Sequence, residues 1–273
     1  MYKFDIELPK EVLTPGKHDY INFNALEGKI ITSLMGHARS GKDSIAKVFV
    51  EDYGYQRVAF ADNIKKEMNL YLKEKVFQDI KRGDALFLFK LDEIDFFTEN
   101  IHMKQFLRPY IIWYGEKLRT INGKFCWINR AFEEEGKNMD KIVLSDVRRL
   151  AELDIFRDSN EFKRRARASM SDAGITNLKS DSLNNYGTLL LEVNQLGLSD
   201  TDNLTLETIK YARENWLIDD TFYVDSRIPE LGEGRKKAII AQVKRIAKKY
   251  GIEKPEKGKY TQTNIFQLPG VVI

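Results

Sequence analysis

The chain has little cysteine and little histidine, and it has no long apolar run. With one cysteine in 273 residues, Cys126, no disulfide can form within the chain. The three histidines, His18, His37 and His102, lie too far apart to match the ligand spacing of a metal site. The longest apolar runs, such as residues 110–114, are too short to cross a bilayer, and the first residues lack the apolar segment of a signal peptide. We therefore expect a soluble protein of a reducing cytoplasm.

The chain also lacks an excess of charge of either sign. Its 44 basic and 41 acidic side chains give a net charge of +3, so no overall field attracts nucleic acid. The hydrophobic fraction of 42% is enough for a sizeable core, and the length suits one large α/β domain with insertions. We expect residues 1–28 to form an N-terminal extension, residues 29–251 the main domain and residues 252–273 a C-terminal tail.

The most informative segment is residues 36–44, Gly-His-Ala-Arg-Ser-Gly-Lys-Asp-Ser, between an apolar run at 30–35 and a helical pattern at 45–49. Strand, glycine-containing turn and helix form the context in which G-x-x-x-x-G-K binds phosphate. Glycine lets successive backbone N–H groups converge on one anion, and lysine adds a charge for the β- and γ-phosphates of a nucleoside triphosphate. The alternative is a glycine turn in which Ser40 only caps the helix. The predicted ATP phosphate site consists of Gly36, Arg39, Ser40, Gly41, Lys42, Asp43 and Ser44.

Two aspartates are candidate ligands of Mg²⁺. Asp43 stands where a hydroxyl residue usually follows the lysine, and its carboxylate suits magnesium directly or through water. Asp146 follows the apolar run at 141–145, where a Walker-B acid would hold the metal or its water. The alternative for Asp146 is a helix N-cap, a position that favours aspartate.

Five short apolar segments alternate with helical patterns, which predicts a parallel sheet with helices on both faces. Asp62 is expected to cap the helix that follows the second strand, and the last helix is expected at about 234–250, basic on one side as in an ordinary surface helix. Ligands of such sheets bind at the carboxyl ends of the strands. The expected strands are residues 30–35, 56–61, 141–145, 188–193 and 221–224.

With these motifs assembled, the chain resembles the deoxynucleoside monophosphate kinases of bacteriophages, a branch of the P-loop nucleotide kinases. Residues 40–44 match that family's S-G-K-D-[ST], residues 58–62 with Lys65 look like its F-A-D-x-x-K, and residues 145–148 with Glu152 look like its S-D-V-R-x-x-x-E. The resemblance implies an α/β kinase domain at 29–251, with a helical acceptor-binding region at about 63–135 and a lid at about 157–185. It also implies Mg²⁺-dependent transfer of the ATP γ-phosphoryl to a deoxynucleoside monophosphate, which supplies phage DNA precursors in the host cytoplasm.

The resemblance also suggests residues for the acceptor and the lid. Arg148 and Arg119 are candidates to bind the acceptor phosphate, because a guanidinium binds phosphate oxygens bidentately. From the basic run 157–167, Arg164 and Arg167 are chosen as the catalytic lid arginines, although most charge runs are solvated helix faces. The further acceptor candidates, each with a plain structural alternative as a cap, surface or core residue, are Asp62, Lys65, Trp113 and Trp127.

Other functions stay open at this point. The same chemistry would serve a modified base within DNA or dephospho-coenzyme A, and a non-catalytic nucleotide-binding protein would also keep the glycine motif. Small nucleotides are the expected partners, nucleic acid is not expected but stays open, and a membrane partner is not expected. A homodimer is expected because dimerisation is common in this class of enzyme.

Overall fold

The computed structural model divides the chain into two compact units. The helical unit consists of residues 1–29, 58–139 and 146–158, and the sheet unit consists of residues 30–57, 140–145 and 159–273. The division passes through the ends of two strands. The residues that the structure describes are 4–37, 40–82, 90–156, 188–196, 203–215, 217–225 and 233–255.

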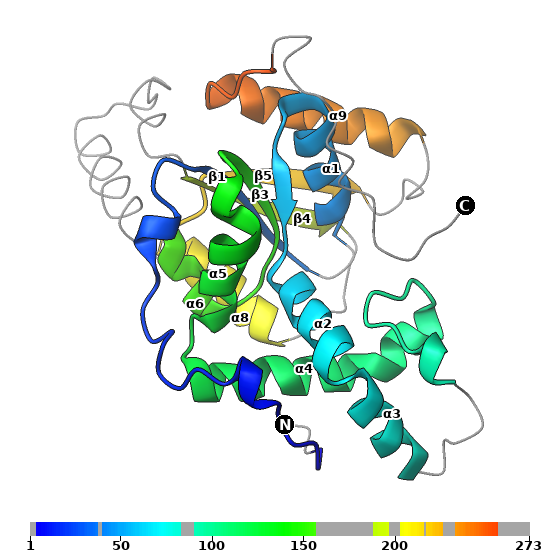
Figure 1. The fold of residues 1–273 in the computed structure, drawn as a ribbon. Helices are drawn as coiled ribbons and strands as arrows, with labels where there is room; N and C mark the ends of the chain where they lie inside the picture. Colours follow the sequence, from blue (N-terminus) through cyan, green and yellow to red (C-terminus); the bar gives the residue numbers. More distant parts are fainter. Residues whose placement is uncertain are drawn as a thin grey trace. The chain divides into compact units, whose positions relative to one another are not determined.

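A five-stranded parallel sheet has the strand order β2-β3-β1-β4-β5 (Figure 1). The central strand β1 pairs with β4 from Ile31 opposite Thr188 to Gly36 opposite Val193. Six of the seven β1 residues are buried, as is typical of a parallel strand covered on both faces. The expected α/β class and all five strands are confirmed. Their bounds are β1 Ile30–Gly36, β2 Gln56–Val58, β3 Lys141–Val147, β4 Thr188–Leu196 and β5 Asp220–Asp225.

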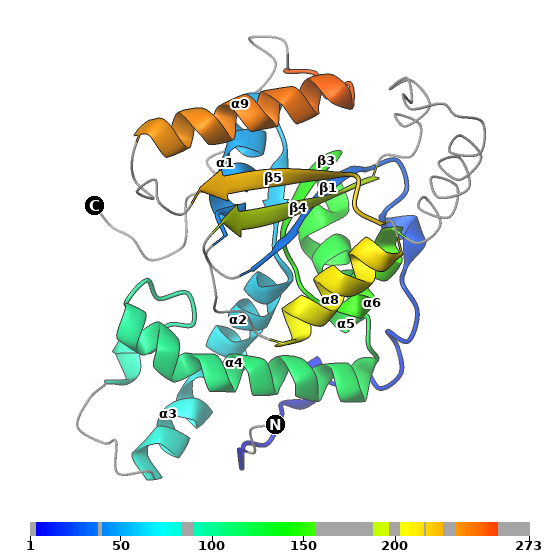
Figure 2. The ribbon, with the colours of Figure 1, turned by 180° about the vertical axis from the view of Figure 1, so that it is seen from behind.

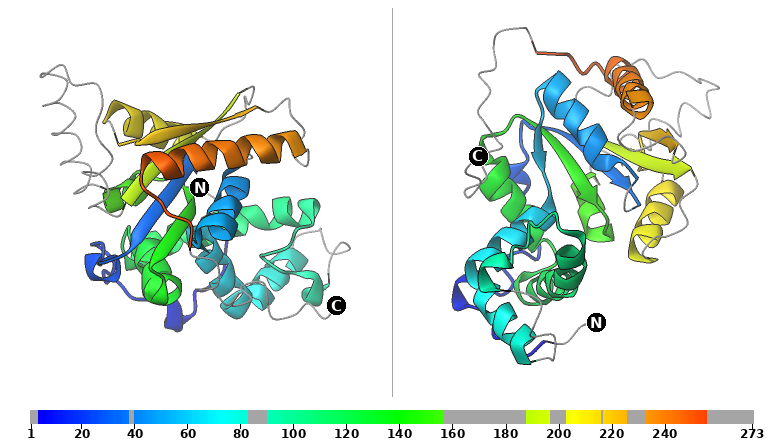
Figure 3. Two further views of the ribbon diagram at one scale, coloured as in Figure 1. Left: turned by 90° about the horizontal axis from the view of Figure 1, so that it is seen from above. Right: turned by 90° about the vertical axis from the view of Figure 1, so that its right-hand side faces the viewer.

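Helices cover both faces of β4 within the sheet unit. Helices α1 (Lys42–Tyr53) and α9 (Glu233–Lys249) contact each other and share one apolar core with Leu191 and Val193 (Figures 2 and 3). Glu192 lies between these two residues in β4, so its side chain points to the opposite face of the sheet. There it pairs with Arg213 of α8 (Asn203–Glu214). The apolar residues of α9 recur at helical spacing (Ile239, Val243, Ile246), which explains how this basic helix packs.

The helical unit is built around α4, a 22-residue helix that continues through Pro109. Helix α2 contacts α3, α4 and α5, and short 3₁₀ turns and a π-helical turn at Ala131–Glu135 connect the rest. The described residues between 63 and 135 are mostly helical, and a role of this region in binding an acceptor stays a prediction. None of the described helices is both long and apolar enough to span a bilayer. The helix bounds are α2 Phe60–Tyr71, α3 Lys73–Arg82, α4 Ile101–Asn122, α5 Cys126–Arg130 and α6 Leu150–Leu153.

The N-terminal extension runs along this unit as a strap. The fully buried side chain of Asn122 accepts from the Thr14 N–H at 2.7 Å and donates to the Val12 carbonyl at 2.8 Å. Asn129 accepts from the Asn22 N–H at 2.9 Å in the same way. Because buried amides are costly when unpaired, these bonds make the extension part of the helical unit rather than an appendage.

Candidate functional site

A glycine loop connects β1 to α1; its described residues are Gly36, His37, Ser40 and Gly41. Gly41 has φ of +95°, a left-handed conformation that other residues adopt only with strain, and it begins α1. Position 36 requires glycine for a different reason, which is lack of space for a side chain. A Cβ there would lie 2.4 Å from the Val193 carbonyl oxygen of β4. The two glycines of the motif thus fix the loop against the sheet.

Lys42 lies inside this loop and is only 5% exposed. Its ammonium donates to the carbonyls of Gly36 at 2.8 Å and His37 at 2.5 Å, and more weakly to Ser40 Oγ at 3.4 Å. All three of these acceptors are oxygens of the loop itself. The loop therefore holds a buried positive charge at the start of a helix, which is the arrangement that favours an anion.

The first turn of α1 adds backbone N–H donors that have no acceptor within the helix. In the described part of the chain no side chain caps this helix, and Gly41 rather than Ser40 occupies the cap position. The alternative in which Ser40 only caps the helix is therefore wrong. The N–H groups of a first turn have no partner within the helix, so an anion at the loop would satisfy them.

The two metal candidates lie in different surroundings. The Asp43 side chain is 85% exposed, and its carboxylate lies 3.6 Å from Nη2 of Arg57. Asp146 is the penultimate residue of β3, the neighbour of β1 in the strand order. The described residues contain no cluster of three or more side chains suited to holding a metal ion. The magnesium site stays a prediction.

Asp146 has a clear structural partner, the first turn of α2. Its Oδ1 accepts from the Phe60 N–H at 3.0 Å and its Oδ2 from the Ala61 N–H at 2.9 Å. Burial raises the pKa of Asp146, while these N–H groups and the charge of Arg148 act in the opposite direction. Asp146 therefore caps α2 across 86 residues of sequence. The prediction that Asp62 caps this helix is wrong, because α2 begins at Phe60 and Asp62 is its third residue.

Glu152 accepts hydrogen bonds from three arginine residues of the helical unit. Its Oε2 accepts from the backbone N–H groups of Arg148 at 2.7 Å and Arg149 at 3.0 Å. Its Oε1 accepts from Nη2 of Arg119 at 3.3 Å, and Arg119 Nη1 donates to Glu116 at 3.0 Å. Burial raises the pKa of Glu152, opposed mainly by Arg119. Sequence reasoning missed Glu116, although its i, i+3 spacing from Arg119 is a recognisable signal.

The other acceptor candidates lie in the same unit with ordinary contacts. Lys65 Nζ lies 3.5 Å from Asp62 Oδ1 and 5.2 Å from the Phe97 ring centroid. Trp127 is buried, and its indole N–H donates to the Gly115 carbonyl at 3.0 Å. Trp113 is also buried.

Both tryptophans pack with aromatic neighbours. The Trp113 ring meets the Phe4 ring edge-on at 5.7 Å between centroids, and the Trp127 ring lies 5.9 Å from that of Tyr114. In this structure both indoles serve the core of the helical unit, and their contact with a base stays a prediction.

The predicted site residues thus divide between the two units. The glycine loop, Lys42, Asp43 and Ser44 belong to the sheet unit, whereas the acceptor candidates, Asp146 and Arg148 belong to the helical unit. Arg39, Arg164 and Arg167, and the lid at 157–185, lie outside the described residues. One residue that the sequence did not single out, Arg235 of α9, is buried beside Gly41.

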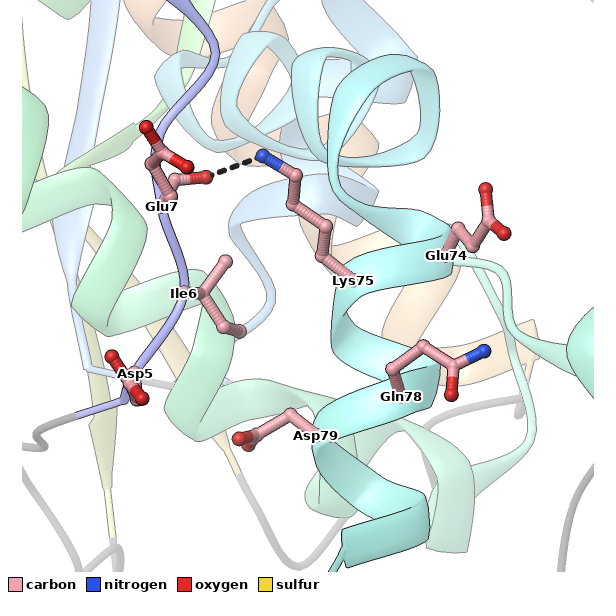
Figure 4. Close-up of a pocket in the computed structure, with 7 residues that line it drawn as sticks. All are labelled: Asp5, Ile6, Glu7, Glu74, Lys75, Gln78 and Asp79. Carbon is pink, nitrogen blue, oxygen red and sulfur yellow. Dashed lines mark hydrogen bonds between the residues drawn. The ribbon is translucent and has the colours of Figure 1, made fainter.

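A hollow of about 320 Å³ lies within the helical unit, between the N-terminal strap and α3 (Figure 4). The side chain of Lys75 lines this hollow and donates to the Glu7 carbonyl at 2.7 Å. None of the predicted site residues is among its lining residues, which are Asp5, Ile6, Glu7, Glu74, Lys75, Gln78 and Asp79.

Comparisons with known proteins give no relative: no protein-family model matches the chain, and no curated protein matches it significantly.

Proposed function

We propose that the protein is an ATP-dependent kinase that transfers the γ-phosphoryl group to a deoxynucleoside 5′-monophosphate and forms the diphosphate. One observation carries the proposal: a buried lysine at the start of α1 whose ammonium lies within a glycine loop and donates to two of its backbone carbonyls. This arrangement favours a polyanion, and the order of the three motifs resembles the phage enzymes. In this proposal the β1–α1 connection is the P-loop of a nucleoside monophosphate kinase fold.

The donor half of the reaction falls to the sheet unit. Lys42 would leave its carbonyl partners for the β- and γ-phosphates, where it neutralises charge that builds up during transfer. The N–H groups of the loop and of the first turn of α1 would bind the same oxygens. Phosphoryl transfer needs positioning and charge neutralisation more than covalent help, so these groups supply what the donor requires.

The acceptor half falls to the helical unit. Arg148 is the candidate to bind the acceptor phosphate, and Glu152 fixes its backbone N–H. Arg119 already pairs with Glu116 and Glu152, so we assign it a positioning role beside the acceptor. Lid arginines would complete the charge neutralisation, with Arg164 and Arg167 as the candidates.

The candidate magnesium ligands, each directly or through water, are Asp43 in the sheet unit and Asp146 in the helical unit. The donor set fits, because a carboxylate has about four lone-pair sites and Asp146 uses two of them for the N–H groups of Phe60 and Ala61. When bound, the ion would supply positive charge that neutralises the phosphate oxygens.

Turnover of Mg·ATP against a panel of acceptors tests the proposal. The panel contains dAMP, dGMP, dCMP, dTMP, 5-hydroxymethyl-dUMP and 5-hydroxymethyl-dCMP, with ribonucleotides, dephospho-coenzyme A and duplex DNA alongside. We expect ADP formation that depends on one or several deoxynucleotides and disappears in Lys42→Ala.

The other outcomes each select a different function. Turnover with DNA alone would move the acceptor to a polymer, and turnover with dephospho-coenzyme A alone would replace the nucleotide acceptor. Bound ATP without turnover on any acceptor would indicate a binding protein.

A further inference from the structure

Arg235 is a buried cation at the start of α9. It is the third residue of that helix and only 5% exposed, whereas the next two residues, Lys236 and Lys237, are exposed. Arginine is rarely buried unless it is paired, because removing a charge from water is costly. The position of Arg235 therefore needs a partner that explains it.

The guanidinium of Arg235 lies against the glycine loop. A Cβ built on Gly41 would be 3.4 Å from Nη2 of Arg235 and 3.7 Å from both methyl groups of Val224. All three residues belong to the sheet unit. The arginine head group thus lies within van der Waals reach of the second glycine of the motif, at the point where α1 begins.

Two donors of this guanidinium are unused. Nε and Nη2 are buried, and no atom of the described chain accepts a hydrogen bond from either. The N–H groups of Nε and Nη2 lie on the same edge of the guanidinium, the edge that binds two oxygens of one phosphate side by side. A buried charge with two unused parallel donors fits an oxyanion better than it fits apolar packing.

We propose that Arg235 is a second cation of the donor site and binds the phosphate chain of the nucleoside triphosphate beside Gly41. This inference rests on the proposed function only in taking the glycine loop as the phosphate site. Lys42 and Arg235 then approach the phosphates from α1 and α9, the two helices packed on the same face of the sheet. The bound phosphate would accept from Nε and Nη2, for which the described residues provide no acceptor.

The test compares Arg235→Met with Lys236→Met, which removes the same charge from the exposed side of the same helix. Binding of Mg·ATP, ADP and tripolyphosphate is measured by calorimetry on the full chain, and thermal unfolding is measured without ligand. For Arg235→Met we expect all three ligands to bind at least about tenfold more weakly, because a charge-assisted hydrogen bond is lost. We expect its unfolding midpoint without ligand to stay level or rise, because an unpaired buried charge is gone.

Lys236→Met should keep the affinity of the wild type within about twofold, since exposed charges are screened. Arg235→Lys serves if the methionine variant does not fold. It keeps the charge but loses the two-donor edge, and we expect intermediate affinity for all three ligands.

Three results would overturn the inference. Affinities equal to wild type in both Arg235 variants would show a packing role. A loss confined to ATP and ADP, with tripolyphosphate unchanged, would assign Arg235 to the base instead of the phosphates. A wild type that binds no nucleotide would remove the proposed function itself, which is distinct from binding that is intact and independent of Arg235.

Discussion

The buried charges of the candidate site differ between the two units. In the helical unit Glu152 accepts three hydrogen bonds and Asp146 two, all from protein donors, and Arg119 contacts two carboxylates. In the sheet unit the Lys42 ammonium donates to two carbonyls of its own loop, and two donors of Arg235 have no acceptor in the described chain. Under the proposed function Lys42 and Arg235 serve a ligand, whereas Glu152 and its partners fix the structure of the helical unit.

The largest expected effect comes from removing the loop cation. Lys42→Ala should lower phosphoryl transfer by at least about 10²- to 10³-fold, as loss of a preorganised charge in an active site does. The fold should stay intact, because the lysine contacts are made to its own loop. Steady-state ADP release measures the effect. Lys47→Ala on the exposed side of α1 is the control. Turnover retained in Lys42→Ala would remove the donor site from this loop.

The second effect should appear in stability. Glu152→Ala leaves Arg119 with one carboxylate and two backbone N–H groups without their acceptor, which should cost about 2–4 kcal/mol of unfolding free energy. Urea unfolding measures it, with the exposed Glu99→Ala as the control. A loss below that of the control would mean that the network does not hold the helical unit together.

The third effect separates acceptor from donor. Arg148→Ala should raise the acceptor KM by about 10- to 100-fold, because a charge-assisted bond to phosphate is lost, and should leave the KM for ATP nearly unchanged. Initial rates with each substrate varied in turn measure both constants. An ATP KM that rises while the acceptor KM stays constant would move Arg148 to the donor site.

The smallest effect is a pH dependence that distinguishes the units. Asp220 of β5 accepts from Lys249 at 2.7 Å and Arg245 at 3.0 Å; burial acts to raise its pKa, but these bonds lower it overall. Because the pKa of Asp220 is lower in the folded state than its ordinary value of 3.8, the ionised carboxylate stabilises the fold at pH values above 3.8. This stabilisation is lost as the pH falls through the pKa of the folded state. Asp220→Asn should therefore cost about 0.5–1 kcal/mol at pH 7, a modest figure because both cations are about half exposed.

The cost of Asp220→Asn should shrink as pH falls below 4, measured by thermal unfolding from pH 7 to pH 3. The pKa values of Glu152 and Asp146 are shifted in the opposite direction. Their raised pKa values mean that the charged forms are penalised in the folded state, and protonation relieves that penalty. A cost for Asp220→Asn that is constant with pH would contradict the assignment.

The sequence predicted what depends on local patterns. The five strands are short apolar runs, and the glycine loop lies between one such run and a helical pattern, so both were expected. The sequence did not predict that Asp146 caps α2. Asp146 is 86 residues from Phe60, and only the folded chain brings them together. The burial of Arg235 was missed for the same reason. The periodicity of apolar residues separates the basic face of α9 from its apolar face, but it does not show that Gly41 contacts this helix.

Hydrogen exchange of the intact chain, with and without substrates, tests the division of roles most directly. We expect Mg²⁺ with a non-hydrolysable ATP analogue to protect the amides of residues 41–46, in the sheet unit. The deoxynucleotide found by the turnover panel should instead protect residues 60–62 and 148–152, in the helical unit. Protection by the ATP analogue confined to the helical unit, or absent at residues 41–46, would contradict the assignment of the donor site to the glycine loop.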